Sequence, residues 1–297
     1  MKLKKGMRAL SVLLILLLAG MALSAGVSAF GINGEADEEQ LKLIGDPASG
    51  NLFHEFGLEE PKIVEGPTIK NYSETKSEID LILEMGGFQD IKGDIVGLID
   101  YDGSEIILLD QNETILEVIW DGSKASQHVI EPKLLGEREF KMYIPSDTDN
   151  SQGKMEGVQL SRIDIKLPTE SGDIGIKTIY AVTVWREDWW DFFGNQNLLH
   201  TQGKFYVDYG IKVDSILDQT YVQTAGGCDR CEFTHYTSGA GTYVGQVTAS
   251  AIWATLQAPT IKCSQDTWVS CDRNCNEDGN GVSDKWGAIG CGCLAIP

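Results

Sequence analysis

Residues 93–122 read GDIVGLIDYDGSEIILLDQNETILEVIWDG, and this stretch decides the fold class. Its apolar runs have the length of β-strands: Asp94–Ile99, Glu105–Leu109 and Thr114–Trp120. Between the first two runs stands Asp102-Gly103, a strong signal for a tight hairpin turn. The pattern therefore predicts an antiparallel meander of three strands.

The sequence on either side of this meander extends the prediction. Upstream, a helix is expected to start near Ser73 as N-cap, to run through Ile79 and Ile82, and to end at Gly86-Gly87. Downstream, further strands are expected at Phe140–Ile144, Val158–Leu167, Gly175–Trp185 and Lys204–Val213. The sequence predicts an α+β or mainly β domain in which the helix covers one face of a sheet.

Aromatic residues gather near the end of one predicted strand, at Trp185, Trp189, Trp190, Phe192 and Phe193. Two interpretations are open for this cluster. The rings either form a platform that stacks on sugars, or they pack the strand end against a short helix.

The N-terminus has the form of a signal peptide. Four basic residues precede an uncharged, apolar run, and Val27-Ser28-Ala29 fits the small-residue cleavage pattern. An uncleaved anchor is the alternative. Without the four positive charges of residues 1–29, the formal charge of −20 becomes −24. Such a charge repels phosphates, so nucleic acid is not expected as a partner, and the protein is expected to be secreted or held at the cell surface.

Composition divides the rest of the chain into three parts. Residues 30–67 are polar and acidic and are expected to form a flexible arm, and residues 68–222 form the cysteine-free β-rich domain. All seven cysteines lie in residues 223–297, directly after the small-residue joint 224–227. This last part is predicted to be a separate cysteine-rich module.

The cysteines of an exported chain are most simply explained by disulfides, because a small module buries too little apolar surface alone. The candidates are Cys228, Cys231, Cys263, Cys271, Cys275, Cys291 and Cys293. Their pairing cannot be deduced from spacing. A redox pair at Cys228 and Cys231, or zinc bound by those two with Cys271 and Cys275, are the alternatives.

An uncharged stretch, 233–261, follows the first two cysteines. Within it Gly241, Gly245 and Ala249 are spaced by four residues and are followed by Trp253. On a helix these residues would share one face, as in closely packed membrane helices. The stretch is predicted to be a membrane-active hairpin or helix, with a small-residue helix packed inside the disulfide scaffold as the alternative.

An acidic segment, NEDGNGVSD at 276–284, is similar to an EF-hand calcium loop. The oxygen ligands would come from Asn276, Asp278, Asn280, the Val282 carbonyl and Asp284. Because Gly287 takes the twelfth position, where EF-hands have a bidentate Glu, weak Ca²⁺ binding is expected. A plain acidic turn is the alternative. No other cofactor is expected.

Signatures of catalysis are missing from the sequence. The four histidines form no HExxH pair, and neither a GxSxG elbow nor a phosphate-binding glycine loop is present. The chain is therefore expected not to be an enzyme.

In organisation the chain resembles the microhalocin-type archaeal bacteriocin precursors. The resemblance rests on the signal peptide, the helix ending at Gly86-Gly87-Phe88 before a meander, the joint TAGGCDRC at 224–231, and the uncharged stretch after it. It implies that a protease cuts near 224–227 and releases an antimicrobial, cysteine-rich peptide that acts on a target membrane. The N-terminal domain would then be the immunity partner that masks the peptide. The alternative function is an intact cell-surface structural or binding protein with a calcium-steadied, disulfide-rich tail.

Overall fold

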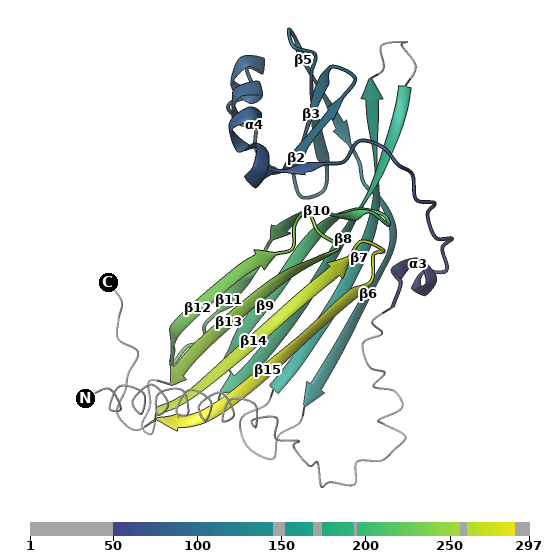
Figure 1. Cartoon of the computed structure of the whole chain (residues 1–297). Helices are drawn as coiled ribbons and strands as arrows, with labels where there is room; N and C mark the ends of the chain where they lie inside the picture. The colour runs from purple at the N-terminus through teal and green to yellow at the C-terminus, as the bar shows by residue number, and fades with distance from the viewer. Residues whose placement is uncertain (1–49, 145–151, 169–173, 193–194, 256–259, 289–297) are drawn as a thin grey trace, which may run out of the picture. The chain divides into compact units, whose positions relative to one another are not determined.

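The computed structural model describes residues 50–144, 152–168, 174–192, 195–255 and 260–288 (Figure 1). The predicted signal peptide, the arm up to residue 49, Cys291 and Cys293 lie outside the described residues. Within them the protein is mainly β, with antiparallel pairing in every sheet, as the sequence predicted. Neither described helix has the length and apolar character that crossing a membrane requires.

The helices are α3 (Leu52–Glu55) and α4 (Tyr72–Gly86). The strands before residue 145 are β1 (Lys70–Asn71), β2 (Asp94–Tyr101), β3 (Ser104–Asp110), β4 (Ile115–Trp120), β5 (Ala125–Ile130) and β6 (Lys133–Ile144). Those that follow are β7 (Gln152–Pro168), β8 (Ile174–Phe192), β9 (Asn195–Asp208), β10 (Lys212–Asp218), β11 (Tyr221–Gln223), β12 (Cys228–Ser238), β13 (Val244–Thr255), β14 (Thr260–Asp272) and β15 (Glu277–Ala288).

The first sheet has the strand order β1-β2-β3-β4-β5, and its centre is the predicted meander. Asp102 and Gly103 both have positive φ, 48° and 75°, as the predicted two-residue hairpin turn requires. Alternate side chains serve two separate cores. Ile106 faces the second sheet, whereas Ile107 packs with Ile79 of α4.

The predicted helix is present as α4, with one correction at its start. Asn71, not Ser73, is the N-cap, and its side-chain oxygen accepts from the backbone N–H of Glu74 at 3.1 Å. At the other end Gly87 takes the left-handed conformation, φ 77°, and caps the helix as expected. The helix packs on β2, so it covers one face of the first sheet.

The second sheet has the order β10-β9-β8-β7-β6, and β11 pairs with β9. β7 and β8 are 17 and 19 residues long. The sequence predicted one strand over Lys204–Val213, but the structure divides it into β9 and β10. The chain turns at Gly210, which has φ 75°, a conformation that a continuous strand excludes.

The third sheet, β12-β13-β14-β15, contains the residues that were predicted to be helical. β13 pairs along its length with β12 and β14, and its exposure alternates residue by residue. Gly245, Ala249 and Trp253 do share one face, as predicted, but it is the inner face of a strand. A spacing of four residues is a multiple of both periods, since strand side chains repeat every two residues. Of the two predicted forms the helix is therefore wrong, whereas a hairpin is present, because consecutive strands β12 and β13 pair antiparallel.

The second and third sheets share a core. One cluster joins Val182 and Phe205 of the second sheet to Val247 and Val269 of the third. β13 and β14 each contact β9. The predicted boundary at 222/223 thus falls between two sheets that bury each other's inner faces.

Part of the predicted arm is ordered. Asn51 caps α3 by accepting from the backbone N–H of Phe53 at 3.0 Å, and Leu52 and Phe53 are buried in the core that the second and third sheets share. Farther along, Ile69 is buried as well. Residues 50–69 are therefore fixed to the β-sheets at both ends, which a purely polar and acidic composition did not indicate.

Candidate functional site

Most of the described cysteines do not form the disulfides that the sequence predicted. Cys228, Cys271 and Cys275 are buried free thiols, so these three contribute to no disulfide scaffold, and Cys263 is buried as well. Cys228 and Cys263 lie in one core cluster, whereas Cys271 and Cys275 lie in another. The zinc set of Cys228, Cys231, Cys271 and Cys275 is therefore split between two places.

Burial raises the pKa of the Cys271 and Cys275 thiols well above the usual value. Each is protonated and unreactive at neutral pH for that reason. Cys231 stands at a bulge of β12, between Arg230 and Glu232, and is half-buried. These two thiols behave as core residues, and Cys231 is the more accessible of the described cysteines.

The predicted membrane-active residues mostly lie inside the protein. Ala249 and Trp253 are 1% and 0% exposed. A side chain at Gly245 would meet Ile216, Phe205 and Val213 at 2.8–3.0 Å, so this glycine permits a close approach of β13 to the second sheet. Gly241 alone lies in an exposed turn, with φ 78°. The small residues thus pack one sheet against another.

The predicted calcium ligands are spread along β15. Asp278, Asn280 and Val282 are exposed and alternate with less exposed residues, and Asp284 lies farther along β15, opposite Ser264 of β14. Side chains two residues apart on a strand are separated by about 7 Å, so these oxygens do not surround one point. Asn276 precedes the strand and bonds through Nδ2 to Asp272 Oδ2 at 2.8 Å. The loop geometry of an EF-hand is absent from these described residues.

A carboxylate cluster does form elsewhere, on the first sheet. Oxygens of Glu78, Asp100 and Glu105 lie within 4.8 Å of one another, and Lys70 pairs with Asp100. Burial raises the pKa of Glu105, and the charges of Glu78 and Asp100 raise it further. Two of the three acids are exposed. Exposed acidic groups of this kind occur without any ion.

The tryptophan cluster is built into the second sheet. Trp189 and Trp190 are each 6% exposed. A side chain at Gly153 would meet the Trp189 ring at 2.0 Å, and one at Gly157 would meet the Trp185 ring at 2.3 Å. The tryptophans therefore pack over glycines of the neighbouring strand β7. The packing interpretation agrees with this arrangement, but the partner is a strand rather than a short helix. The side chains of Phe192 and Phe193 lie outside the described set.

A cavity that the sequence did not predict lies beside the start of β8. We call residues 61–67 the strap, residues 175–178 the β8 edge, and the cavity of about 330 Å³ between them the strap slot. The strap contributes Pro61, Lys62, Val64, Glu65, Gly66 and Pro67 to its lining. The other side is formed by the β8 edge, with Tyr101, Leu167, Tyr180, Asp208 and Tyr209 nearby. Its volume is at the lower limit of ligand pockets, which span about 300–1,000 Å³.

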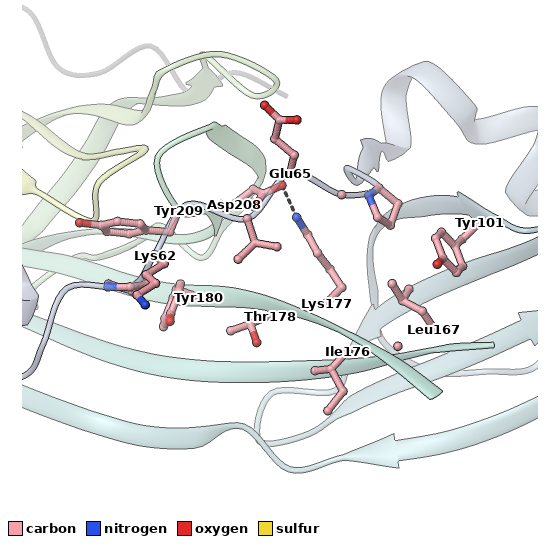
Figure 2. Close-up of a pocket in the computed structure, with 15 residues that line it drawn as sticks. Lys62, Glu65, Tyr101, Leu167, Ile176, Lys177, Thr178, Tyr180, Asp208 and Tyr209 are labelled. Carbon is pink, nitrogen blue, oxygen red and sulfur yellow. Dashed lines mark hydrogen bonds and ion pairs between the residues drawn. The ribbon is translucent and has the colours of Figure 1, made fainter. Parts of the chain in front are cut away.

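A buried ion pair closes one side of the strap slot. Figure 2 shows Lys177 and Asp208 joined by a dashed line, and both side chains are about 95% buried. Burial raises the pKa of Asp208, while its contact with Lys177 lowers it. Lys177 and Asp208 neutralise each other, so this wall carries no net charge.

Asp214 adds a second buried carboxylate near this pair. It is 0% exposed, and Lys212 Nζ lies 3.1 Å from its Oδ1. Burial is the main cause that raises the pKa of Asp214 to about 7. Lys212 also donates to the Ile69 carbonyl at 2.9 Å, so it ties the end of the 50–69 segment to β10.

Aromatic rings hold the other end of the strap slot. Phe53 makes edge-to-face contacts with Tyr180 and Tyr209, at ring-centroid distances of 5.1 and 5.3 Å. Burial raises the pKa of both tyrosines. This packing fixes α3, from which the strap extends.

Sequence reasoning missed the strap slot because its walls come from residues about 110 positions apart. A local signal existed in Lys177, a basic residue inside a predicted strand between Ile176 and Thr178-Ile179. A buried lysine requires an acidic partner. Nothing in the sequence names Asp208 as that partner.

Comparisons with protein-family models, with curated proteins and with solved structures find no match to this chain.

Proposed function

We propose that this chain is exported and acts outside the cytoplasm as an intact β-sheet protein of the cell surface, with a structural or binding role. Its cysteine-rich part would then be a permanent layer of the protein. The supporting observation is the core in which Val247 and Val269 pack with Val182 and Phe205.

The free energy of apolar burial favours a third sheet that stays packed on the second. Removing the third sheet would expose the apolar inner face of the second, and each fully buried Val, Leu or Phe side chain stabilises a fold by about 1.5–3 kcal/mol. In the other direction, the released segment would expose Ala249, Ala251 and Trp253. Both pieces would lose their cores on separation.

We further propose that any disulfide of the exported protein involves Cys231. Cys231 is disulfide-bonded, whereas Cys228, Cys271 and Cys275 are free thiols, and the partner of Cys231 would be Cys291 or Cys293. Peptide mapping without reduction should find one bridge from Cys231 to the C-terminal peptide. A bridge that includes Cys271 or Cys275 would contradict this pairing.

The test of intactness uses the native secreted protein. Its intact mass should correspond to residues 30–297, with Phe30 at the N-terminus. Recombinant residues 30–222, made without the third sheet, should be insoluble or should melt without cooperativity. A stable, cooperatively folding 30–222 fragment, together with a native mass that ends near residue 227, would contradict the proposal.

A specific observation favours the bacteriocin precursor as a second candidate. Thr224, Gly226 and Gly227 are exposed, and Gly227 has φ 83°, so the joint is an accessible turn between β11 and β12. A protease could cut there, as the precursor hypothesis requires. In that case purified, oxidised 228–297 should release dye from liposomes and inhibit related strains, and 30–220 should neutralise it. The absence of both effects would leave the surface-protein function.

A further inference from the structure

We propose that the strap slot is a docking site for a short, uncharged, extended peptide segment of a partner protein, which would pair with the β8 edge as an added strand. The inference deepens the proposed function and rests on it for the extracellular setting. Its physical basis is the strand edge itself.

The start of β8 has a strand on one side only. β8 pairs with β7 from Ile174 onward, but its pairing with β9 begins at Tyr180 opposite Val207. Among the described residues no strand accompanies Ile174–Ile179 on that second side, and no backbone hydrogen bond joins them to the strap. An open edge of this kind presents unpaired N–H and C=O groups to an incoming strand.

The strap slot follows this edge. Gly175, Ile176, Lys177 and Thr178 are consecutive, and all four line the cavity. Figure 2 labels the last three of them. Consecutive strand residues point to opposite faces, so a cavity that touches all four runs along the backbone. Four residues extend over about 10 Å, which suits a peptide of similar length. The strap forms the opposite wall. The cavity therefore lies beside the β8 edge, where an additional strand would pair.

The charge of the lining selects the occupant. The charged lining residues are Lys62, Glu65, Lys177 and Asp208, two of each sign, in a chain of net charge −20. Lys177 and Asp208 are already paired with each other. The other two, Lys62 and Glu65, have opposite signs, so the lining carries no net charge that would favour an acidic or a basic peptide. A second copy of this chain is disfavoured as the occupant, because two chains of net charge −20 repel each other.

The rim of the strap slot is apolar and exposed. Ile176 is 64% exposed on the β8 edge, and Val64 is 69% exposed on the strap. Natural sheet edges are usually protected from pairing with another strand by a charge, a proline or a bulge. An exposed β-branched residue at an open edge favours such pairing instead. Strand addition gains affinity from main-chain hydrogen bonds and specificity from such side-chain contacts. The expected peptide is therefore rich in Val, Ile and Thr.

The test measures binding of a probe peptide, acetyl-Val-Thr-Ile-Thr-Val-amide, to intact 30–297 by titration calorimetry. Hydrogen exchange of the β8 edge should slow when the probe is added. The Ile176→Lys variant should weaken binding at least tenfold, because a charge at an open edge opposes strand pairing. The matched control is Val129→Lys, since Val129 is 63% exposed on β5, another edge strand. It should leave binding unchanged.

Two further probes separate the alternatives. A probe with N-methyl groups on alternate residues should not bind, because it cannot complete the ladder. The second probe is the sugar cellobiose, which should not slow hydrogen exchange of the β8 edge. The proposal is overturned if the unmodified peptide fails to bind, if Ile176→Lys leaves its affinity unchanged, or if cellobiose slows this exchange and the peptide does not. Probe-free dimers that Ile176→Lys dissociates would also overturn it in favour of a second copy.

The test of the docking site can fail or succeed independently of the test of the proposed function. Native protein that is cleaved near 227, while uncut 30–297 still binds the probe at the β8 edge, refutes intactness only. Native protein that stays intact but does not bind the probe refutes the docking site only.

Discussion

The first and third sheets are both antiparallel meanders of neighbouring strands, yet only the strands of the first could be predicted from the sequence. In the first sheet β3 and β4 have continuous buried runs, since α4 covers one face and the second sheet covers the other. In the third sheet β13 buries alternate residues as far as Trp253, several of them small. Apolar runs between turn signals identify strands directly, whereas small residues among Ser and Thr are compatible with either a helix or a strand. The amount of burial on each face therefore decided which sheet could be predicted.

The largest expected effect lies in the third sheet, at its most buried ring. Trp253 is fully buried, so Trp253→Ala should lower the free energy of unfolding by about 3–5 kcal/mol. Tyr236→Ala on the neighbouring strand β12 is the control, because Tyr236 is 60% exposed, and its effect should stay within about 0.5 kcal/mol. Chemical denaturation of both variants measures the difference. Equal, small effects would mean that the third sheet is not a packed layer.

The next effect concerns the first sheet and depends on pH. Glu117 is fully buried, and its carboxylate oxygens have no hydrogen bond of ordinary geometry among the described residues. Burial raises its pKa to about 7, against the backbone N–H and charge of Lys166, which lower it. The folded state therefore holds this proton more tightly than the unfolded state does. The stabilisation is complete below the unfolded pKa near 4.5 and is lost as pH rises through 7.

Glu117→Gln should remove this pH dependence. Wild-type stability should fall between about pH 4.5 and 7.5 by roughly 3 kcal/mol more than that of the variant, since each pKa unit corresponds to 1.36 kcal/mol. Glu113→Gln, at an exposed position before β4, is the control and should keep the wild-type slope. Urea melts at several pH values provide the measurement. Parallel curves for wild type and Glu117→Gln would refute the assignment.

A smaller effect distinguishes the strand from the predicted helix at residues 245 and 246. Gly245→Leu should cost about 1–3 kcal/mol, because its side chain would overlap Ile216, Phe205 and Val213. Gln246 points away from this core and donates to Thr248 at 3.1 Å, so Gln246→Leu should change stability by about 0.5 kcal/mol or less. Thermal melts of the two variants give the comparison. A larger loss for Gln246→Leu would place β13 in the wrong register.

The smallest effect tests the local turn signal of the first sheet. Gly103 has φ 75°, so Gly103→Ala should cost about 1 kcal/mol, which reflects the left-handed backbone alone. No heavy atom lies within 4 Å of an added Cβ there, so crowding does not contribute. Ser104→Ala serves as the control. A neutral Gly103→Ala would show that the turn is not of the predicted type.

Local chemistry explains which features could be predicted. Asp102-Gly103 and Gly87 each require a positive φ, and that requirement is visible in a few neighbouring letters. The strap slot has no such signature, because Ile176 and Val64 become neighbours only after the second sheet forms. Lys177 and Asp208 likewise meet across two strands. The cysteine pattern misled for a related reason, since Cys271 and Cys275 fill a core that their spacing does not reveal.

The most direct test of the account is a single cut at the exposed joint. A protease site placed at Gly226-Gly227 would allow the folded 30–297 chain to be nicked between β11 and β12 without touching either sheet. No disulfide can join the two fragments, because every cysteine lies in 227–297. The fragments should nevertheless elute together in native size-exclusion chromatography and separate only in denaturant. Elution of folded 30–226 apart from 227–297 in native buffer would contradict the central claim that the cysteine-rich sheet is a permanent layer of this protein.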